Sequence, residues 1–312
     1  MLKFSVDCGK SAVKLALKKA NGELYVDTFP FVVNQGHLER FDNNVHHVTF
    51  NSTNYTVGDD SKGFSKEQFE TTDKLSNENK VAIYTAIAKM MKEIEAPFGS
   101  NISLATNVPL VHFKNEAKRS EYAPFFEKNN ISIAVDGVNY QFSVKEVTPA
   151  YESIGYALNN AEELRGSETI LFDFGSLNFT YTMLDENLRP NVAKSGGLRQ
   201  GSHIILNEVN RKLQESDYSY SNNDITKIIQ GVKNCKDEAK QIIDTTILNY
   251  LRQEIFGKLA HLDFNEKVRM TGGSSLLFST YLNEIFKDHD DFKISNNCCY
   301  DNAVGFLELL ED

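Results

Sequence analysis

The chain has 312 residues, of which 41% are hydrophobic and 24% are charged, a composition typical of a folded protein with a sizeable core. Its length exceeds what one hydrophobic core usually supports, so two domains or two lobes are expected. The 43 acidic residues outnumber the 33 basic ones, and the formal net charge of -10 argues against direct binding to a nucleic-acid backbone.

Neither export nor a membrane span is indicated. A secretory signal needs a continuous apolar stretch, but the N-terminus MLKFSVDCGK already carries Asp7, and no run of about eighteen apolar residues follows. The four cysteines are scattered without C-x-x-C or metal-ligand spacing, so reduced thiols are expected. We therefore expect a cytoplasmic protein with no membrane partner.

The chain opens with the pattern of a three-stranded meander. Residues 2–7 and 12–17 are expected strands joined by a tight turn, and Asn21-Gly22 is a strong hairpin signal before a third strand over residues 23–31. The other elements expected in this half are a hairpin over residues 45–58, a helix capped by Ser76 or Asn77 and stopped by Pro97, a strand over 102–106, a hairpin at Asp136-Gly137, and a helix over 151–164 opened by Pro149.

The second half is expected to begin in the same way. A strand runs to Asp173, turns at Gly175 and Ser176, and is followed by strands over residues 179–184 and near 191–194. The elements expected after these are a loop through Ser195-Gly196-Gly197 and Gly201, helices over 202–215, 224–232 and 236–261, a strand-to-helix junction over 268–275, and a closing helix from about residue 301. Both halves thus start with a meander followed by helices, which indicates an architectural repeat despite low identity between the halves.

The two strand-turns have a composition suited to phosphate binding. FSVDCGKSAVKLAL begins at residue 4 and ILFDFGSLNFTYTM at residue 170, and each runs an apolar strand into Asp-x-Gly. Small residues in such a turn let backbone N–H groups approach phosphate oxygens closely. The carboxylates of Asp7 and Asp173 suit the hydration shell of Mg²⁺ bound to a nucleotide, and Lys14 could direct a cation at the phosphates.

A third glycine turn, Gly272-Gly273-Ser274-Ser275, precedes an expected helix, whose N-terminus suits the ribose and α-phosphate side of a nucleotide. Each signal alone has a structural alternative. Asp7 could be only a turn former, Lys14 a solvated strand residue, Glu152 a surface helical residue, and the Gly272-Gly273 pair only a turn. Their order within a repeated unit favours a nucleotide site.

Here the sequence resembles the superfamily of actin, the seventy-kilodalton heat-shock chaperones and the sugar kinases, over nearly the whole chain. DCGKSAVK at residues 7–14 is similar to its first phosphate motif, FDFGS at 172–176 to its second, and VRMTGGSS at 268–275 to its adenosine motif. VTPAYESIGYAL at 147–158 and DNAVGF at 301–306 resemble the two inter-domain helices. Within the superfamily, the short length and the segments NYTVGDD, ATNVPLVHF and TPAYESIGYAL are similar to the ParM/StbA-type bacterial actins that segregate plasmids.

The resemblance implies an α/β fold of the actin-like (ribonuclease H-like) duplicated type, with two lobes around a central nucleotide cleft. One lobe would comprise residues 1–158 with 300–312, including a helix that carries Glu152, and the other residues 159–299. It implies ATP or GTP with Mg²⁺ as cofactors, and Glu152 as the catalytic residue that orients the attacking water. The implied nucleotide contacts are Asp7, Gly9, Lys10, Ser11, Lys14, Asp173, Gly175, Ser176, Gly272, Gly273 and Ser274, with Asp7 and Asp173 facing Mg²⁺ through water.

The implied function is a nucleotide-dependent, filament-forming NTPase that segregates plasmid or phage DNA. Its partners would be further copies of itself and a centromere-binding adaptor protein of ParR type, without direct nucleic-acid binding. The alternatives are a small-molecule kinase and a chaperone-like or scaffold ATPase of the same superfamily. One departure from the family pattern is Leu177, where many actins have a second glycine in the second phosphate loop; a Cβ there restricts the turn and puts a γ-phosphate contact in question.

Overall fold

The computed structural model describes residues 1–36, 45–59, 74–262 and 266–311. The chain divides into two compact units, Met1–Asn159 with Tyr300–Asp312 and, as one continuous segment, Asn160–Cys299. Among the described residues, no helix combines the length and the apolar character needed to cross a bilayer. Asp60, the last residue of NYTVGDD, lies outside the described residues.

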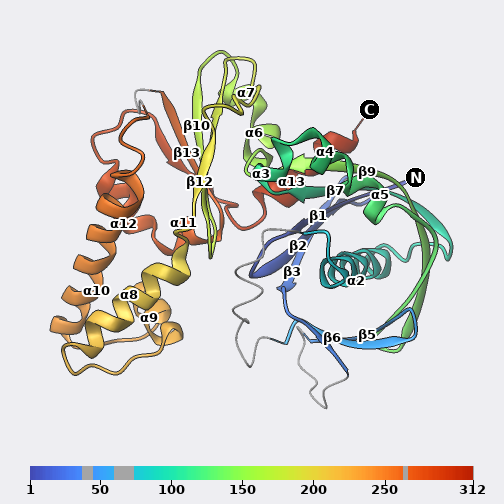
Figure 1. Ribbon diagram of the computed structural model, residues 1–312, viewed down its shortest axis with the longest axis horizontal. Helices are drawn as coiled ribbons and strands as arrows, with labels where there is room; N and C mark the ends of the chain where they lie inside the picture. Colours follow the sequence, from blue (N-terminus) through green and yellow to red (C-terminus); the bar gives the residue numbers. More distant parts are fainter. Residues whose placement is uncertain (37–44, 60–73, 263–265, 312) are drawn as a thin grey trace. The chain divides into compact units, whose positions relative to one another are not determined.

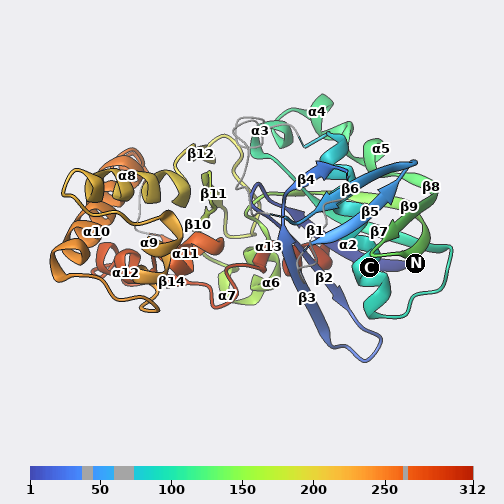
Figure 2. The same ribbon diagram turned by 90° about the horizontal axis from the view of Figure 1, so that it is seen from below.

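The first unit is built on a sheet with the strand order β3-β2-β1-β7-β9-β8-β5-β6-β4. The expected meander is confirmed as β1 (Leu2–Cys8), β2 (Ala12–Lys18) and β3 (Leu24–Pro30), all antiparallel. Figure 2 shows the β2–β3 hairpin extending beyond its neighbours. On the other side of β1 the pairing is parallel, first to β7 (Ser100–Val108) and then from β7 to β9 (Val138–Tyr151).

The remaining elements of this unit follow the expected hairpins. The Asp136-Gly137 turn joins antiparallel β8 and β9, as predicted, and the expected hairpin over residues 45–58 forms β5 and β6. The bounds of the other elements are β4 (Val33–Gln35), β5 (His46–Phe50), β6 (Thr53–Val57), β8 (Lys128–Val135), α3 (Leu110–Phe113), α4 (Glu116–Ser120) and α5 (Tyr122–Phe126).

The core of the first unit forms between the sheet and α2 (Asn77–Glu93), around which the sheet curves in Figure 1. The helix begins at the expected cap, where the Ser76 side chain accepts a hydrogen bond from the Asn79 N–H. Strand β1 turns Phe4 and Val6 into this core, because alternate residues of a strand share a face. The opposite face is covered by α13 (Asp301–Leu307), whose Ala303 packs on Ala16 of β2.

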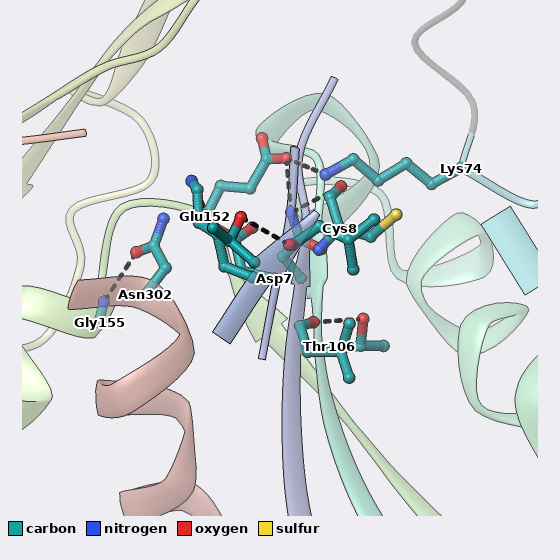
Figure 3. Close-up of polar contacts among 12 residues, drawn as sticks. Asp7, Cys8, Lys74, Thr106, Glu152, Gly155 and Asn302 are labelled. Atoms are coloured by element: carbon teal, nitrogen blue, oxygen red, sulfur yellow. Dashed lines mark hydrogen bonds and ion pairs between the residues drawn. The ribbon is translucent and has the colours of Figure 1, made fainter. Parts of the chain in front are cut away.

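Helix α13 crosses α6 (Gly155–Asn159) at a pair of glycines. A Cβ on Gly305 would collide with the carbonyl group of Gly155, and a Cβ on Gly155 would collide with the backbone of Asn302. The Gly155 N–H donates to Asn302 Oδ1 at 3.3 Å (Figure 3). Only glycine permits this backbone approach, so these two segments, far apart in the chain, lie in direct contact. A 3₁₀ turn, Glu308–Leu310, ends the helix.

The predicted helix over residues 151–164 is wrong in its first part. Strand β9 continues through Pro149 to Tyr151, because these residues pair in parallel with Thr106, Asn107 and Val108 of β7. Glu152 therefore lies in a turn after a strand and not on a helix, and Ser153 follows with a φ of 75°. The helical part is limited to α6 and α7 (Ala161–Leu164).

The second unit repeats the topology that surrounds β1. Its sheet has the order β12-β11-β10-β13-β14, and the pairings are antiparallel, antiparallel, parallel and parallel, as in β3-β2-β1-β7-β9. The strands are β10 (Thr169–Phe174), β11 (Phe179–Leu184), β12 (Gly196–Leu198), β13 (Lys267–Thr271) and β14 (Phe292–Ile294). The architectural repeat predicted from the sequence is confirmed.

The third strand of this meander was misplaced in the prediction. Residues 191–194 form a turn in which the Asn191 side chain accepts a hydrogen bond from the Lys194 N–H, and the strand comes later, at residues that were expected to form a loop. Position 196 of this strand requires a glycine, because the Tyr181 ring of β11 occupies the space where a Cβ would lie. Two adjacent glycines suggested a loop, but here Gly196 accommodates a neighbouring side chain.

The helices of the second unit pack on one hydrophobic core with β10. Phe172 and Phe174 contact a cluster that includes Ile205 and Val209 of α8 and Ile243 of α10. The helices are α8 (Ser202–Gln214), α9 (Asn222–Ile229), α10 (Asp237–Tyr250, continued as a π-helix over Leu251–Phe256), α11 (Gly273–Leu277) and α12 (Ser279–Ile285). Helix α9 starts two residues before its predicted start because Ser221 and Asp224 form a capping box.

Candidate functional site

The first phosphate loop is the connection between β1 and β2, residues 8–12. Gly9 donates its N–H to the Ala12 carbonyl at 2.9 Å, which closes a tight turn. A Cβ at position 9 would lie 3.0 Å from the same carbonyl oxygen. Among the described residues, the N–H of Ser11 donates to no other group. The loop thus offers an unsatisfied N–H donor at the end of a buried strand.

Asp7 and Lys14 form an ion pair at the base of this loop. They lie opposite each other in the β1–β2 register, and Lys14 Nζ lies 3.1 Å from Asp7 Oδ2. Asp7 is almost completely buried, whereas a turn-forming aspartate would be exposed. Just before Asp7, the Thr106 hydroxyl donates to the Val6 carbonyl and ties β7 to β1 (Figure 3). Lys14 is therefore positioned at the loop, with its ammonium on the carboxylate that was expected to face Mg²⁺.

Glu152 lies in the same polar cluster, although it is far from the loop in sequence. Lys74 Nζ donates to Glu152 Oε1 at 2.6 Å, and Figure 3 shows the two side chains reaching toward each other. Asn107, at the end of β7, donates through Nδ2 to the same oxygen at 3.3 Å and accepts through Oδ1 from the Cys8 N–H at 3.0 Å. The first unit thus brings Asp7, the phosphate loop and Glu152 together through Lys74 and Asn107.

Lys74 is a buried cation in this cluster. Its side chain is 6% exposed, against 23% for Glu152. Burial alone would lower the pKa of Lys74, but the carboxylates of Glu152 and Asp7 more than offset this, so the pKa lies above its ordinary value. The ammonium therefore remains charged at neutral pH and holds two carboxylates that would otherwise repel each other.

Cys8 is held in the loop as a neutral thiol. Burial raises the pKa of its thiol to about 12, even though Lys74 and two further lysines favour the thiolate. The thiol donates to Asn79 Oδ1 at 3.2 Å, which connects the loop to the first turn of α2. Cys8 is thus a packing residue of the loop and not a nucleophile.

The second phosphate loop, residues 175–178, is closed in the same manner. The Gly175 N–H donates to the Asn178 carbonyl at 2.9 Å. The first N–H groups of α8 donate back to the loop, from Ser202 to the Gly175 carbonyl and from His203 to the Ser176 carbonyl. In the described part of the chain, the N–H groups of Ser176 and Leu177 have no acceptor. These two donors are thus available to an anion.

Leu177 does not distort this loop. It is absent from the residues with positive φ, so its backbone conformation does not require a glycine. Its carbonyl accepts the Gly201 N–H at 2.7 Å, and a side chain on Gly201 would collide with the backbone of Ser176 and Leu177. The steric constraint expected at Leu177 is instead found at Gly201.

The third glycine turn lies against the second phosphate loop. Gly272 has a φ of 85°, and a Cβ on it would collide with Asp173 Oδ1 and lie 2.5 Å from the Phe174 carbonyl oxygen. The Ser274 hydroxyl donates to the Gly175 carbonyl at 2.9 Å. Asp173, Gly175 and Ser176 are thus grouped with Gly272 and Ser274, while Gly273 is exposed beside them. Helix α11 has five residues and no side-chain cap at Gly272, so its dipole is small.

The residues present in each unit fit part of a Mg-nucleotide. Each unit places one carboxylate at a strand end and, beside it, N–H donors without a protein acceptor, which are the groups that recognise hydrated Mg²⁺ and phosphate oxygens. Sequence reasoning did not single out Lys74 or Asn107. Lys74 carried no local signal because its partner is 78 residues away, and Asn107 lies just beyond the strand expected over residues 102–106, although β7 continues to Val108.

Residues 5–155 match the family model of the N-terminal domain of actin-like proteins. This domain belongs to the actin-like proteins. No curated protein matches the chain by sequence. Solved structures match the chain over its whole length, at low identity. The apo ParM protein of psk41 is 16% identical, with a TM-score of 0.70 over 99% of this chain and 96% of the other.

Two further structures extend this comparison. The AlfA filament from a B. subtilis plasmid, pLS32, is 17% identical, with a TM-score of 0.66 over 100% of this chain and 99% of the other. The archaeal actin homologue Ta0583 in complex with ADP is 15% identical, with a TM-score of 0.69 over 99% of both chains. The chain as a whole therefore has the actin-like α/β fold, as expected from its motifs.

Proposed function

We propose that this actin-like protein is a cytoplasmic, filament-forming NTPase that segregates plasmid or phage DNA through a centromere-binding adaptor. The observation that carries the proposal is the convergence of a phosphate loop, the Asp7–Lys14 pair and the Glu152 carboxylate in one unit. The second unit supplies the matching loop with Asp173 and Gly272. The two units would be the two actin-like lobes, and their half-sites together would bind one Mg-nucleotide.

The roles of the individual residues follow from their chemistry. The N–H groups of Ser11, Ser176 and Leu177 would bind phosphate oxygens, and Asp7 and Asp173 would face the water shell of Mg²⁺. Bound Mg²⁺ would neutralise charge on the phosphates. Glu152 would accept a hydrogen bond from the attacking water and orient it, a contribution on the order of a hundredfold in rate that adds little to nucleotide affinity.

Support for assembly comes from one of the solved structures named above, the filament of AlfA from plasmid pLS32. We propose the same assembly here, with nucleotide binding favouring the filament and hydrolysis weakening it. Because the chain carries a formal charge of -10, it would repel duplex DNA, and a basic adaptor of ParR type would have to hold the centromere.

The primary experiment compares the wild type with Glu152→Gln in Mg-ATP and in Mg-GTP. Phosphate release, nucleotide affinity and electron micrographs of the polymer are measured on the same samples. The wild type should form filaments and release phosphate, while the variant should bind and assemble normally but release phosphate about a hundredfold more slowly. Glu162→Gln is the matched control. Hydrolysis by the wild type without filaments would contradict the proposal and favour a kinase or scaffold ATPase.

The adaptor is tested by co-sedimentation. Filaments are pelleted with duplex DNA alone, and then with DNA and the product of the neighbouring gene. DNA should pellet only in the second case. A chain with a formal charge of -10 releases few counterions from DNA, so filaments alone should not bind it. Salt-resistant binding of DNA by filaments alone would contradict the adaptor and indicate a direct DNA-binding scaffold.

A further inference from the structure

The carboxylate of Glu152 is held by one of its two oxygens. Lys74 Nζ and Asn107 Nδ2 both donate to Oε1, at 2.6 Å and 3.3 Å. In the described part of the chain, Oε2 receives no hydrogen bond. Fixing one oxygen with two donors sets the plane and direction of the carboxylate, and it leaves the second oxygen with its lone pairs available.

Asn107 occupies the place between the phosphate loop and Glu152. In the sheet, β7 lies between β1 and β9, and both pairings are parallel, so the carboxyl ends of the three strands meet at one edge. Strand β1 leads into the phosphate loop, β9 ends one residue before Glu152, and β7 ends at Val108, next to Asn107. The buried amide spans the gap, since Oδ1 accepts the Cys8 N–H while Nδ2 donates to Glu152 and, at 3.4 Å, to the Cys8 carbonyl.

We infer that Asn107 is a positioning residue that couples the first phosphate loop to Glu152, and that Lys74 fixes the same carboxylate oxygen so that Oε2 is presented to the attacking water. This inference rests on the proposed function and adds to it the residues that orient the catalytic group. A displacement of the loop is passed to Glu152 through one side chain, because the amide has a fixed length and both of its ends are bonded. Loss of either donor would let the carboxylate rotate.

A purely structural role for Asn107 makes a different prediction. If the amide only held the loop, through the N–H and the carbonyl of Cys8, then Asn107→Asp would lower the rate by the same factor whether or not Glu152 is intact. In that variant the donor to Glu152 is lost, and a carboxylate is placed next to another carboxylate. A comparison of Asn107→Asp in the wild type and in Glu152→Gln therefore separates the positioning role from the structural one, and Asn107→Ala removes all three contacts.

The test is a set of single-turnover measurements of phosphate release with Mg-ATP and Mg-GTP, together with nucleotide affinity and thermal melting. Asn107→Asp, Asn107→Ala and Lys74→Met should each lower the rate constant by roughly ten- to a hundredfold, as expected for a small misplacement of a catalytic group. Nucleotide affinity should change by less than about threefold, because the misplaced group acts mainly in the transition state. Lys74→Arg should recover part of the rate, because a guanidinium can donate to the same oxygen.

Matched controls exist in the chain. Lys89→Met removes another largely buried lysine, which pairs with Asp27 at 3.1 Å, and Asn210→Asp changes a half-buried asparagine, whose Nδ2 donates to the Tyr220 carbonyl. Both should leave phosphate release unchanged per folded molecule. A double-mutant cycle with Glu152→Gln completes the design: in that background Asn107→Asp should have no further effect on the rate, since a positioning residue acts through its partner.

The outcomes separate the two levels of the argument. If the wild type releases no phosphate, or if Glu152→Gln is as active as the wild type, the proposed function fails and the inference falls with it. If Glu152→Gln is slow but Asn107→Asp and Lys74→Met match the wild type, only the inference is overturned. Additive effects of Asn107→Asp and Glu152→Gln would also overturn it, since the two residues would then act independently.

Discussion

The two phosphate loops stand on the same five-strand arrangement, but their surroundings hold them by different means. In the first unit, buried charges organise the loop: Lys14 on Asp7, and Lys74 on Glu152. In the second unit, the backbone and a hydroxyl do so, through the N-terminus of α8 and through Ser274. The repeated scaffold therefore supplies two equivalent positions, and one of them carries a cluster of paired charges.

The comparison predicts that the second unit matters through its single carboxylate. Asp173→Ala should reduce phosphate release to background and weaken Mg-nucleotide binding, because one of the two carboxylates proposed to face the metal's waters is lost. Asp290→Ala, an exposed aspartate of the same unit, is the control. Hydrolysis at the wild-type rate in Asp173→Ala would remove this residue from the site.

A smaller but still large effect is expected at Gly272. Gly272→Ala should lower nucleotide affinity at least tenfold, because the new methyl group collides with Asp173 and the positive φ strains any larger residue. Gly231→Ala is the matched control, since its φ is 72° and its surroundings are open, so it should cost only about 1 kcal/mol in the free energy of unfolding. Isothermal titration and urea denaturation measure the two quantities. Equal affinities in both variants would refute the packing of the adenosine motif against the loop.

The second unit also has a buried cation, and its role should differ from that of Lys74. The side chain of Arg269 is 1% exposed and pairs with Glu163 and Asp291, both at 2.8 Å. Arg269→Met should lower the free energy of unfolding by about 3 kcal/mol, through lost charged hydrogen bonds, but leave phosphate release per folded molecule unchanged. The exposed Arg211→Met should cost less than about 1 kcal/mol. A lower rate of phosphate release in folded Arg269→Met would contradict the expected difference between Arg269 and Lys74.

The smallest effect concerns the cysteines beside the two half-sites. Because burial raises the pKa of Cys8 to about 12, its thiolate appears only as the pH approaches that value, and iodoacetamide should leave it unmodified between pH 7 and 10. Cys299 is exposed, and its Sγ would lie 3.6 Å from a Cβ on Gly273, so it should react, and bound Mg-nucleotide should slow the reaction. Peptide mapping by mass spectrometry measures the modification of both cysteines, with Cys299→Ser as the control. Rapid labelling of Cys8 at pH 8 would show that the loop opens.

The sequence predicted the parts of the fold that local signals determine. The strands around Asn21-Gly22 and Asp136-Gly137, and the two Asp-x-Gly turns, could be located because turn residues and alternating burial are local properties. The environment of Glu152 could not be predicted in the same way. Pro149 is a common first residue of a helix, and only the pairing of β9 with β7 extends the strand past it. Long-range pairing overrides local preference in such segments.

The candidate site shows the same division. Some site residues could be proposed because they lie in short sequence motifs: Asp7, Gly9, Asp173 and Gly272. Lys74 and Asn107 could not, since their relevance depends on contacts with residues 78 and 45 positions away. Leu177 was expected to restrict its loop, but the steric constraint lies at Gly201, which packs against the loop from a separate segment.

The packing of α6 against α13 affects the order in which the two units can fold. The first unit needs α13, which covers a face of its sheet, and α13 is synthesised only after the whole of the second unit. Residues 160–299, by contrast, form the second unit without interruption and can finish folding while the first sheet is still uncovered. The first unit is therefore completed after the second, and a released chain that ends at residue 299 should hold a folded second unit beside an incomplete first one.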